Sequence, residues 1–154
     1  MPPDIQLIMM GEALKEARKA FVSDEVPVGA VILHGRDIIA RAHDQVEMLK
    51  DPTAHAEMIA ITQAANHLGS KWLQGCTMYV TIEPCSMCAG ALVLARIDKV
   101  FFGAKSGKTG ACGSVLDIPG HKALNHQVQV VGGVLESECA AIMSDFFRNK
   151  RRKS

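Results

Sequence analysis

Apolar residues recur at intervals of three and four positions near the start of the chain. They are Leu7, Met10, Leu14, Ala17 and Phe21. This spacing places them on one face of an amphipathic α-helix, which we expect over residues 4–22. The next segment, PVGAVILHGRDIIARA, has two β-branched runs on either side of residues 34–37. It predicts a β-hairpin, and its almost continuously apolar first arm predicts a strand that is covered on both faces.

A helix start signal follows the hairpin. Asp51 is a favoured N-cap residue, and Pro52 suits the first helical position. Apolar residues then keep the helical period as far as Leu68, and Gly69 suits the position just after a helix. We therefore expect a helix over residues 52–68.

Strand-like and helix-like segments alternate after Gly69. We expect a strand at 77–82, a helix at 85–95 opened by Pro84, a strand at 99–103, a glycine-rich loop at 104–126, a strand at 128–131 and a helix at 136–150. This order predicts an α/β fold, a three-layer α/β/α sandwich around a five-stranded mixed sheet with its later strands parallel. The crossovers place the helix starts near 52 and 84 at the carboxyl ends of strands, where open α/β sheets bind ligands.

Length and charge limit the number of domains and the kinds of partner that we expect. The chain has 154 residues and a net charge of +1, so we expect a single domain over residues 1–154 without a global basic field. Residues 148–154 nevertheless carry five basic side chains and no acidic one, which leaves twelve basic and sixteen acidic residues elsewhere. This basic tail could be an arm for phosphates, but composition favours a frayed, solvated terminus.

Targeting signals and disulfides are not evident. The N-terminal residues MPPDIQLIMM lack a basic region and a cleavage site, and no apolar run is long enough to span a bilayer. We expect a cytoplasmic protein with no membrane partner. The odd number of cysteines, five, with one tight Cys-x-x-Cys pair, is typical of metal or redox chemistry rather than of a disulfide framework.

Three residues are candidate metal ligands. Cys85 and Cys88 lie three positions apart at the start of the second predicted crossover helix, where the helix dipole favours thiolates. His55 lies at the start of the preceding helix, and one imidazole with two thiolates suits Zn²⁺. Three protein ligands leave a fourth position open for water, as in catalytic zinc sites. Loops could still bring a fourth ligand, for which Cys112, His43 and His126 remain candidates, whereas Cys76 is expected at the opposite end of the sheet.

Glu57 is the candidate proton carrier beside the metal. It follows His55 by two positions, close enough to exchange protons with bound water without being a ligand. Taken singly, His55 could be a capping or core histidine, Glu57 a surface charge in a first helical turn, and Cys85-x-x-Cys88 a redox pair. Together, His-Ala-Glu and Pro-Cys-x-x-Cys match the signature of the zinc nucleobase deaminases.

The sequence resembles the bacterial tRNA-specific adenosine deaminases of the cytidine deaminase-like superfamily. The similar segments are EVPVGAV (25–31), DPTAHAE (51–57), YVTIEPCSMCAGA (79–91), FGAKSGKTGACGS (102–114), NHQVQV (125–130) and ECAAIMSDFFR (138–148). The resemblance implies hydrolytic deamination of the wobble adenosine to inosine in a tRNA anticodon. It also implies a homodimer that binds the anticodon stem-loop across subunits, with one Zn²⁺ per subunit.

The resemblance also implies residue roles. His55, Cys85 and Cys88 would bind zinc, and Glu57 would carry protons between the attacking water, a ring nitrogen of a flipped-out adenine and the departing ammonia. The implied substrate contacts are the backbone of Ala56 and Glu83, the pocket residues Val28, Ala104 and Lys105, and the positions occupied here by Asp44 and Ser106.

Three positions depart from the family pattern. Asp44 replaces an asparagine, Ser106 replaces an aspartate, and Lys105 replaces an arginine. An ionised Asp44, which we place at the pocket mouth, accepts hydrogen bonds but cannot donate them. Ser106 could lose a ribose contact, and Lys105 keeps the charge but not the planar fork of arginine.

Two other hypotheses remain open. A deaminase of a free base such as guanine would share DPTAHAE and Pro-Cys-x-x-Cys, and Asp44 could accept from the amino or imino groups of a purine. A non-catalytic zinc-stabilised module that binds RNA or protein is the other hypothesis, although it gives no purpose to a carboxylate beside an open metal position.

Overall fold

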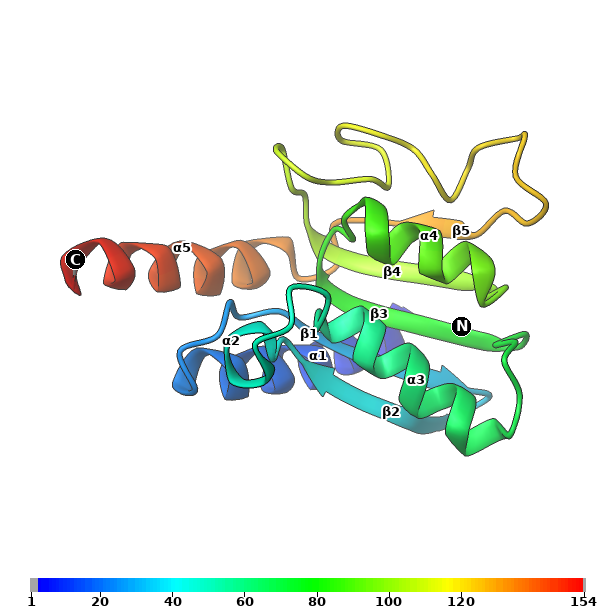
Figure 1. The fold of residues 1–154 in the computed structure, drawn as a ribbon, viewed down its shortest axis with the longest axis horizontal. Coiled ribbons are helices and arrows are strands. Elements are labelled where there is room, and N and C mark those ends of the chain that lie inside the picture. The colour runs from blue at the N-terminus through cyan, green and yellow to red at the C-terminus, as the bar shows by residue number, and fades with distance from the viewer. Residues whose placement is uncertain (1–2, 154) are drawn as a thin grey trace.

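The computed structural model describes residues 3–153 and contains one mixed sheet (Figure 1). Its strands are β1 (Gly29–His34), β2 (Asp37–His43), β3 (Cys76–Ile82), β4 (Lys99–Ala104) and β5 (Gln129–Val131). They lie in the order β2-β1-β3-β4-β5. β1 is antiparallel to both of its neighbours, whereas β3, β4 and β5 are parallel. The predicted five-stranded mixed sheet with parallel later strands is confirmed.

Helices cover both faces of this sheet. They are α1 (Pro3–Val22), α2 (Val46–Leu49), α3 (Ala56–Leu68), α4 (Ser86–Leu94) and α5 (Glu136–Lys153). α3 and α4 pack on one face, and α1 and the start of α5 pack on the other. The three-layer sandwich is therefore confirmed. The later turns of α5 extend past the end of the sheet, as Figure 1 shows.

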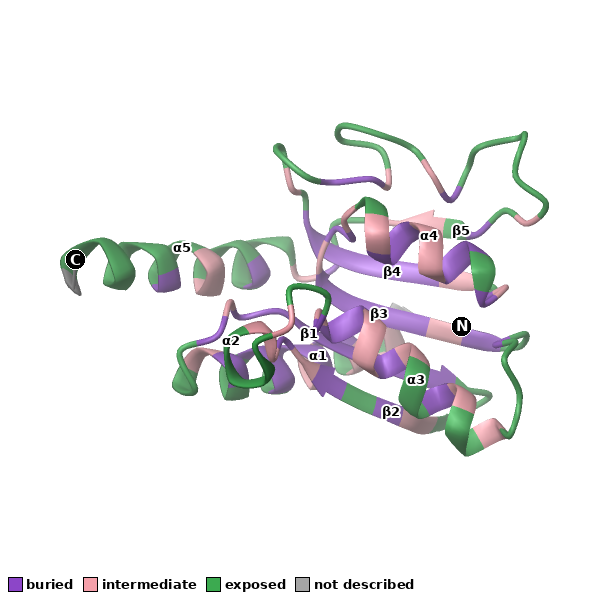
Figure 2. Ribbon diagram, viewed as in Figure 1, coloured by how far each residue is buried: buried purple, intermediate pink, exposed green. Residues whose placement is uncertain are grey.

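The central strands are buried because both of their faces are apolar. Alternate residues of β1 enter different cores: Ala30 and Ile32 pack toward α3 and α4, and Val31 and Leu33 pack toward α1. The period of two along a strand explains this division. Figure 2 shows β3 and β4 mostly in the colour of buried residues. The expectation that the first arm of the hairpin is covered on both faces is confirmed.

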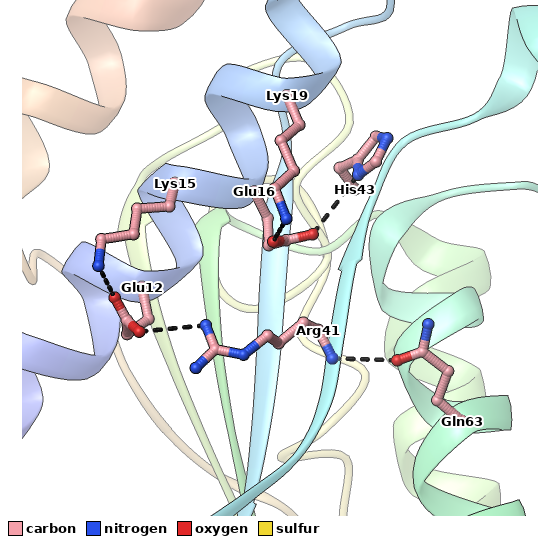
Figure 3. Close-up of polar contacts among 7 residues, drawn as sticks. All are labelled: Glu12, Lys15, Glu16, Lys19, Arg41, His43 and Gln63. Carbon is pink, nitrogen blue, oxygen red and sulfur yellow. Dashed lines mark hydrogen bonds and ion pairs between the residues drawn. The ribbon is translucent and has the colours of Figure 1, made fainter.

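Side chains from both layers hold the edge strand β2 (Figure 3). The backbone N–H of Arg41 donates to Oε1 of Gln63 in α3 at 3.0 Å, and its guanidinium contacts Glu12 in α1 at 3.1 Å. The first of these contacts gives one backbone N–H group of the edge strand a partner. Gly29 lets α1 approach β1 closely, since a Cβ there would lie 2.0 Å from the carbonyl oxygen of Ala13.

The start of α3 differs from the prediction. The helix begins at Ala56 with His55 as its N-cap, rather than at Pro52. Oδ1 of Asp51 instead accepts hydrogen bonds from the backbone N–H of Thr53 at 2.8 Å and from its hydroxyl at 2.7 Å. This local turn satisfies Asp51 before a helix can start. The short helix α2 was not predicted either.

The basic terminus also differs from the prediction. α5 continues to Lys153, so the expected fraying is wrong for the described residues, and Ser154 lies outside them. Basic side chains are favourable near the C-terminal end of a helix dipole. Lys150 also pairs with Asp24 at 2.9 Å, which ties the helix to the segment after α1. Within residues 3–153, no helix is both long and apolar enough to cross a bilayer.

Candidate active site

Two helix N-termini bring the predicted metal ligands together. His55 is the N-cap of α3, and Cys85 is the N-cap of α4 directly after β3. Nδ1 of His55 lies 3.6 Å from Sγ of Cys85 and 3.6 Å from Sγ of Cys88. Among the residues that the structure describes, these three form the group of ligand-type side chains close enough to share one ion.

The spacing of the three donors fits zinc. Zn–N and Zn–S bonds of about 2.0 and 2.3 Å at tetrahedral angles would separate nitrogen from sulfur by about 3.5 Å. The observed 3.6 Å separations match this value. The other candidate ligands are engaged elsewhere: His43 contacts Glu16, and His126 contacts the carbonyl oxygen of Ile97 at 2.8 Å. Cys112 is half-buried outside the group. A tetrahedral ion held by these three residues would have one position left for solvent.

The ligands are also electrostatically coupled. Hydrogen bonds from Cys88 and His55 lower the pKa of Cys85 to about 3. The same contact with Cys85 raises the pKa of His55 to about 9. Its hydrogen bond to Cys85 raises the pKa of Cys88 above its ordinary value. Without a metal, the site therefore holds a thiolate, an imidazolium and a thiol, so binding a cation must release protons.

Glu57 lies in the first turn of α3, and its side chain is almost entirely buried, with 2% of the residue exposed. Burial, followed by the charge of Asp44, raises the pKa of Glu57 to about 8. The residue lines the same cavity as His55 and Cys85. A buried carboxyl beside the ligands of a cation is suited to carrying protons.

Asp44 is buried at the helix start rather than placed at the cavity mouth as expected. It is 6% exposed, and its Oδ1 accepts a hydrogen bond of 2.7 Å from the backbone N–H of Ala56. Burial raises the pKa of Asp44 to about 6. Its capping of α3 means that one of its oxygens already has a partner.

The cavity at the site has a volume of about 1030 Å³. Four of the seven residues named for substrate contact, Val28, Asp44, Glu83 and Ser106, are among those that line it, and so is the proton carrier Glu57. Three others are not: Ala56 and Ala104 are buried, and Lys105 is exposed. Sequence reasoning missed the contribution of α5, which adds Met143, Phe146, Phe147, Lys150 and Arg151 to the lining. Its sequence shows an amphipathic helix but nothing of where that helix docks.

Glu83 shapes the cavity through its side chain. Its backbone N–H already donates to the carbonyl oxygen of Ala104 at 2.8 Å. Its carboxylate accepts hydrogen bonds from the backbone N–H groups of Ser106, Cys112 and Ser114 and from the hydroxyl of Ser114. Burial works to raise the pKa of Glu83, but the hydrogen bonds from Ser114, Ser106 and Cys112 outweigh it and leave the pKa below its usual value.

Comparison with known proteins identifies the family. Residues 5–151 match the MafB19-like deaminase family. The chain is 49% identical to the tRNA-specific adenosine deaminase of Bacillus subtilis (strain 168), over 95% of this chain and 91% of that protein. It is 51% identical to the enzyme of the same name from Aquifex aeolicus (strain VF5), over 90% of this chain and 91% of that protein. The chain belongs to the tRNA-specific adenosine deaminase family.

A solved structure supports this membership of the tRNA-specific adenosine deaminases. It comes from a study of A-to-I editing by tRNA:A34 deaminases at the wobble position. It resembles this fold with a TM-score of 0.84 and 42% sequence identity, over 87% of this chain and 97% of that chain. The cytidine deaminase-like fold that the sequence implied is confirmed.

Proposed function

We propose that this chain hydrolyses the wobble adenosine of a tRNA anticodon to inosine and releases ammonia. The cluster of His55, Cys85 and Cys88 beside buried Glu57 is the observation that supports the proposal. Hydrolytic deamination requires a cation with a free position for water and a group that carries protons. Identities of 49% and 51% to tRNA-specific adenosine deaminases support the substrate.

We propose that one Zn²⁺ is held by Nδ1 of His55 and by the sulfurs of Cys85 and Cys88. Bound there, it would lower the pKa of a water molecule to roughly 7. The donor set and the 3.6 Å separations support this assignment.

Glu57 is the proposed proton carrier of the reaction. A bond forms between the water oxygen and C6 of the adenine, and the bond between C6 and the exocyclic nitrogen breaks. Of the two protons of the water, Glu57 passes one to the ring nitrogen N1 and one to the departing amine, so that inosine and ammonia are the products. Its burial keeps bulk solvent from competing for these protons.

The lining of the cavity supports an RNA substrate. Lys108, Lys150 and Arg151 line it, and so does Phe147, which is 42% exposed. Cations can contact phosphates, and an aromatic ring can stack on an unpaired base. The reacting base must leave its stack to reach Glu57, so a loop nucleotide suits the cavity better than a paired one.

The remaining substrate contacts and the assembly are part of the same proposal. Val28, Asp44, Glu83 and Ser106 line the cavity and are proposed to surround the nucleotide. Ala56, Ala104 and Lys105 are not among the lining residues, so their substrate contacts remain predictions. The homodimer and the cytoplasmic location remain predictions, and light scattering on the purified protein tests the first.

One assay tests the function. Zinc-loaded protein is incubated with an anticodon stem-loop that carries adenosine at the wobble position, and with the same stem-loop carrying guanosine there. Parallel reactions contain adenine, adenosine, guanine or cytosine, and ammonia is measured together with the mass of each product. Ammonia only from the adenosine stem-loop, with inosine formed, supports the proposal. Release from guanine would favour a free-base deaminase, and no release at full zinc occupancy would favour a binding module.

A further inference from the structure

The segment between β4 and β5 depends on one carboxylate for much of its shape. Residues 105–128 contain no helix or strand of their own, apart from isolated bridges. Loops of this length are uncommon in compact domains, and binding loops are one class of them. Figure 1 draws the segment in yellow beside α4. Residues 106–109 line the cavity, and we call them the cavity wall.

Both oxygens of Glu83 are used to hold this segment. Oε1 accepts from the backbone N–H of Ser106 at 3.1 Å and from the hydroxyl of Ser114. Oε2 accepts from the backbone N–H groups of Cys112 and Ser114, each at 3.0 Å. Glu83 is 2% exposed, so water cannot easily replace these bonds. The Glu83 side chain therefore links the two ends of the segment from Ser106 to Ser114.

Close packing and the neighbouring backbone reinforce this closure. A Cβ at Gly110 would lie 2.5 Å from Cδ of Glu83 and 2.5 Å from the carbonyl oxygen of Ser106. The N–H of Ala111 donates to the carbonyl oxygen of Pro84 at 2.9 Å, and Gly110 forms a bridge with Cys85. The wall is thus attached to the strand end that also presents a metal ligand.

We propose that Glu83 is a positioning residue that holds the cavity wall in place for RNA binding. Its carboxylate bonds to Ser106, Cys112 and Ser114, so the side chain acts on the nucleotide through the wall. This inference rests on the proposed function, since it assigns the wall to the stem-loop. Ser106 and Lys108 are the wall residues that would meet the nucleotide and its phosphates, and their positions follow from the anchored backbone.

The Glu83→Gln variant tests the inference, because an amide directs N–H donors toward the N–H groups of the loop. We expect amide hydrogen exchange at Ser106, Cys112 and Ser114 to accelerate about ten-fold. The KM for the stem-loop should rise about ten-fold or more while kcat changes little, and zinc should stay at one ion per chain. Ser114→Ala removes only the hydroxyl donor from an exposed residue, and it should show the same changes at a smaller size.

Two controls separate positioning from general stability. Asp117→Asn makes the same chemical change in the same segment, at an exposed carboxylate that accepts from the N–H of Gly120. Leu14→Ala weakens the core on the opposite face of the sheet. Neither should alter exchange at the three amides or the KM, when measured well below the melting temperature.

The outcomes are distinguishable from failure of the proposed function. A wild-type protein that leaves the stem-loop unchanged refutes that function, while exchange still decides whether Glu83 holds the wall. Unchanged exchange in Glu83→Gln overturns the inference. So does faster exchange with an unaltered KM in an active enzyme, or loss of zinc from the variant.

Discussion

The backbone N–H of Ala56 donates to Oδ1 of Asp44 across 2.7 Å, which joins the residue after β2 to the first turn of α3. The first N–H groups of a helix have no partner within it, and a carboxylate is favoured at that end by the helix dipole. His55 precedes Ala56 and Glu57 follows it. This hydrogen bond therefore helps to fix the positions of both His55, the candidate metal ligand, and Glu57, the candidate proton carrier.

Stability should depend on pH through Asp44. Its pKa in the fold is about 6, raised by burial from 3.8. The folded state then binds this proton more tightly than the unfolded chain, so the stabilisation is complete below pH 3.8 and is lost as the pH rises through 6. Asp44→Asn does not titrate and keeps an acceptor for Ala56. In metal-free protein, the stability of the variant relative to the wild type should increase between about pH 4 and 7, by at most about 3 kcal/mol.

Urea denaturation in the presence of a chelator measures this difference. Asp37→Asn, at an exposed position in the hairpin, is the matched control. If the difference in unfolding free energy between the wild type and Asp44→Asn does not change with pH, the fold does not raise the pKa of Asp44.

Glu57→Gln should abolish turnover while leaving the metal bound. The amide keeps the shape of the side chain but cannot carry a proton, and general acid–base catalysis contributes about 10²–10⁴-fold. Inosine formation under single-turnover conditions and zinc content by mass spectrometry are the measurements. Glu138→Gln, an exposed change on α5, serves as the control. Near-wild-type deamination by Glu57→Gln would refute the proposed role.

Cys88→Ala should lose zinc and the stability that depends on it. Two ligands hold zinc far less well than three, and binding free energy at a folded site is also folding free energy. A chelator should lower the melting temperature of the wild type but not that of the variant. Cys76→Ala, a buried cysteine at the other end of β3, should keep its zinc and its response to the chelator. Full zinc occupancy in Cys88→Ala would show that the ligand set is wrong.

Arg151→Ala should weaken stem-loop binding through the phosphates. Arg151 lines the cavity from α5, and removing one phosphate contact should reduce the slope of log K against log salt by about 0.7–0.9. Fluorescence anisotropy at several salt concentrations measures both effects. Arg36→Ala, in the β1–β2 turn at the opposite end of the sheet, is the charge-matched control. An equal loss in both variants would mean that net charge, and not the α5 end of the cavity, attracts the RNA.

Local patterns predicted most of the elements because each depends on neighbouring residues. The alternation in β1 divides its side chains between two cores, and Gly69 ends α3 in the left-handed conformation, with a φ of 64°. The start of α3 was placed wrongly because Asp51 and Pro52 form a convincing helix signal, yet Asp51 is satisfied within a turn by Thr53. Asp51 can either cap a helix or accept hydrogen bonds within a turn, and the sequence pattern does not show which of the two is more stable.

The candidate site could be predicted from the chain because residue type and spacing alone indicate a donor set. His55, Cys85 and Cys88, with Glu57 two positions after the histidine, predicted a zinc deaminase before any fold was known. Only the tertiary structure decided what surrounds that set: α5 closing one side of the cavity, Asp44 capping α3, and Glu83 gathering three distant N–H groups. Such contacts join residues far apart in the chain, and they form where the packing of the layers leaves buried donors that need an acceptor.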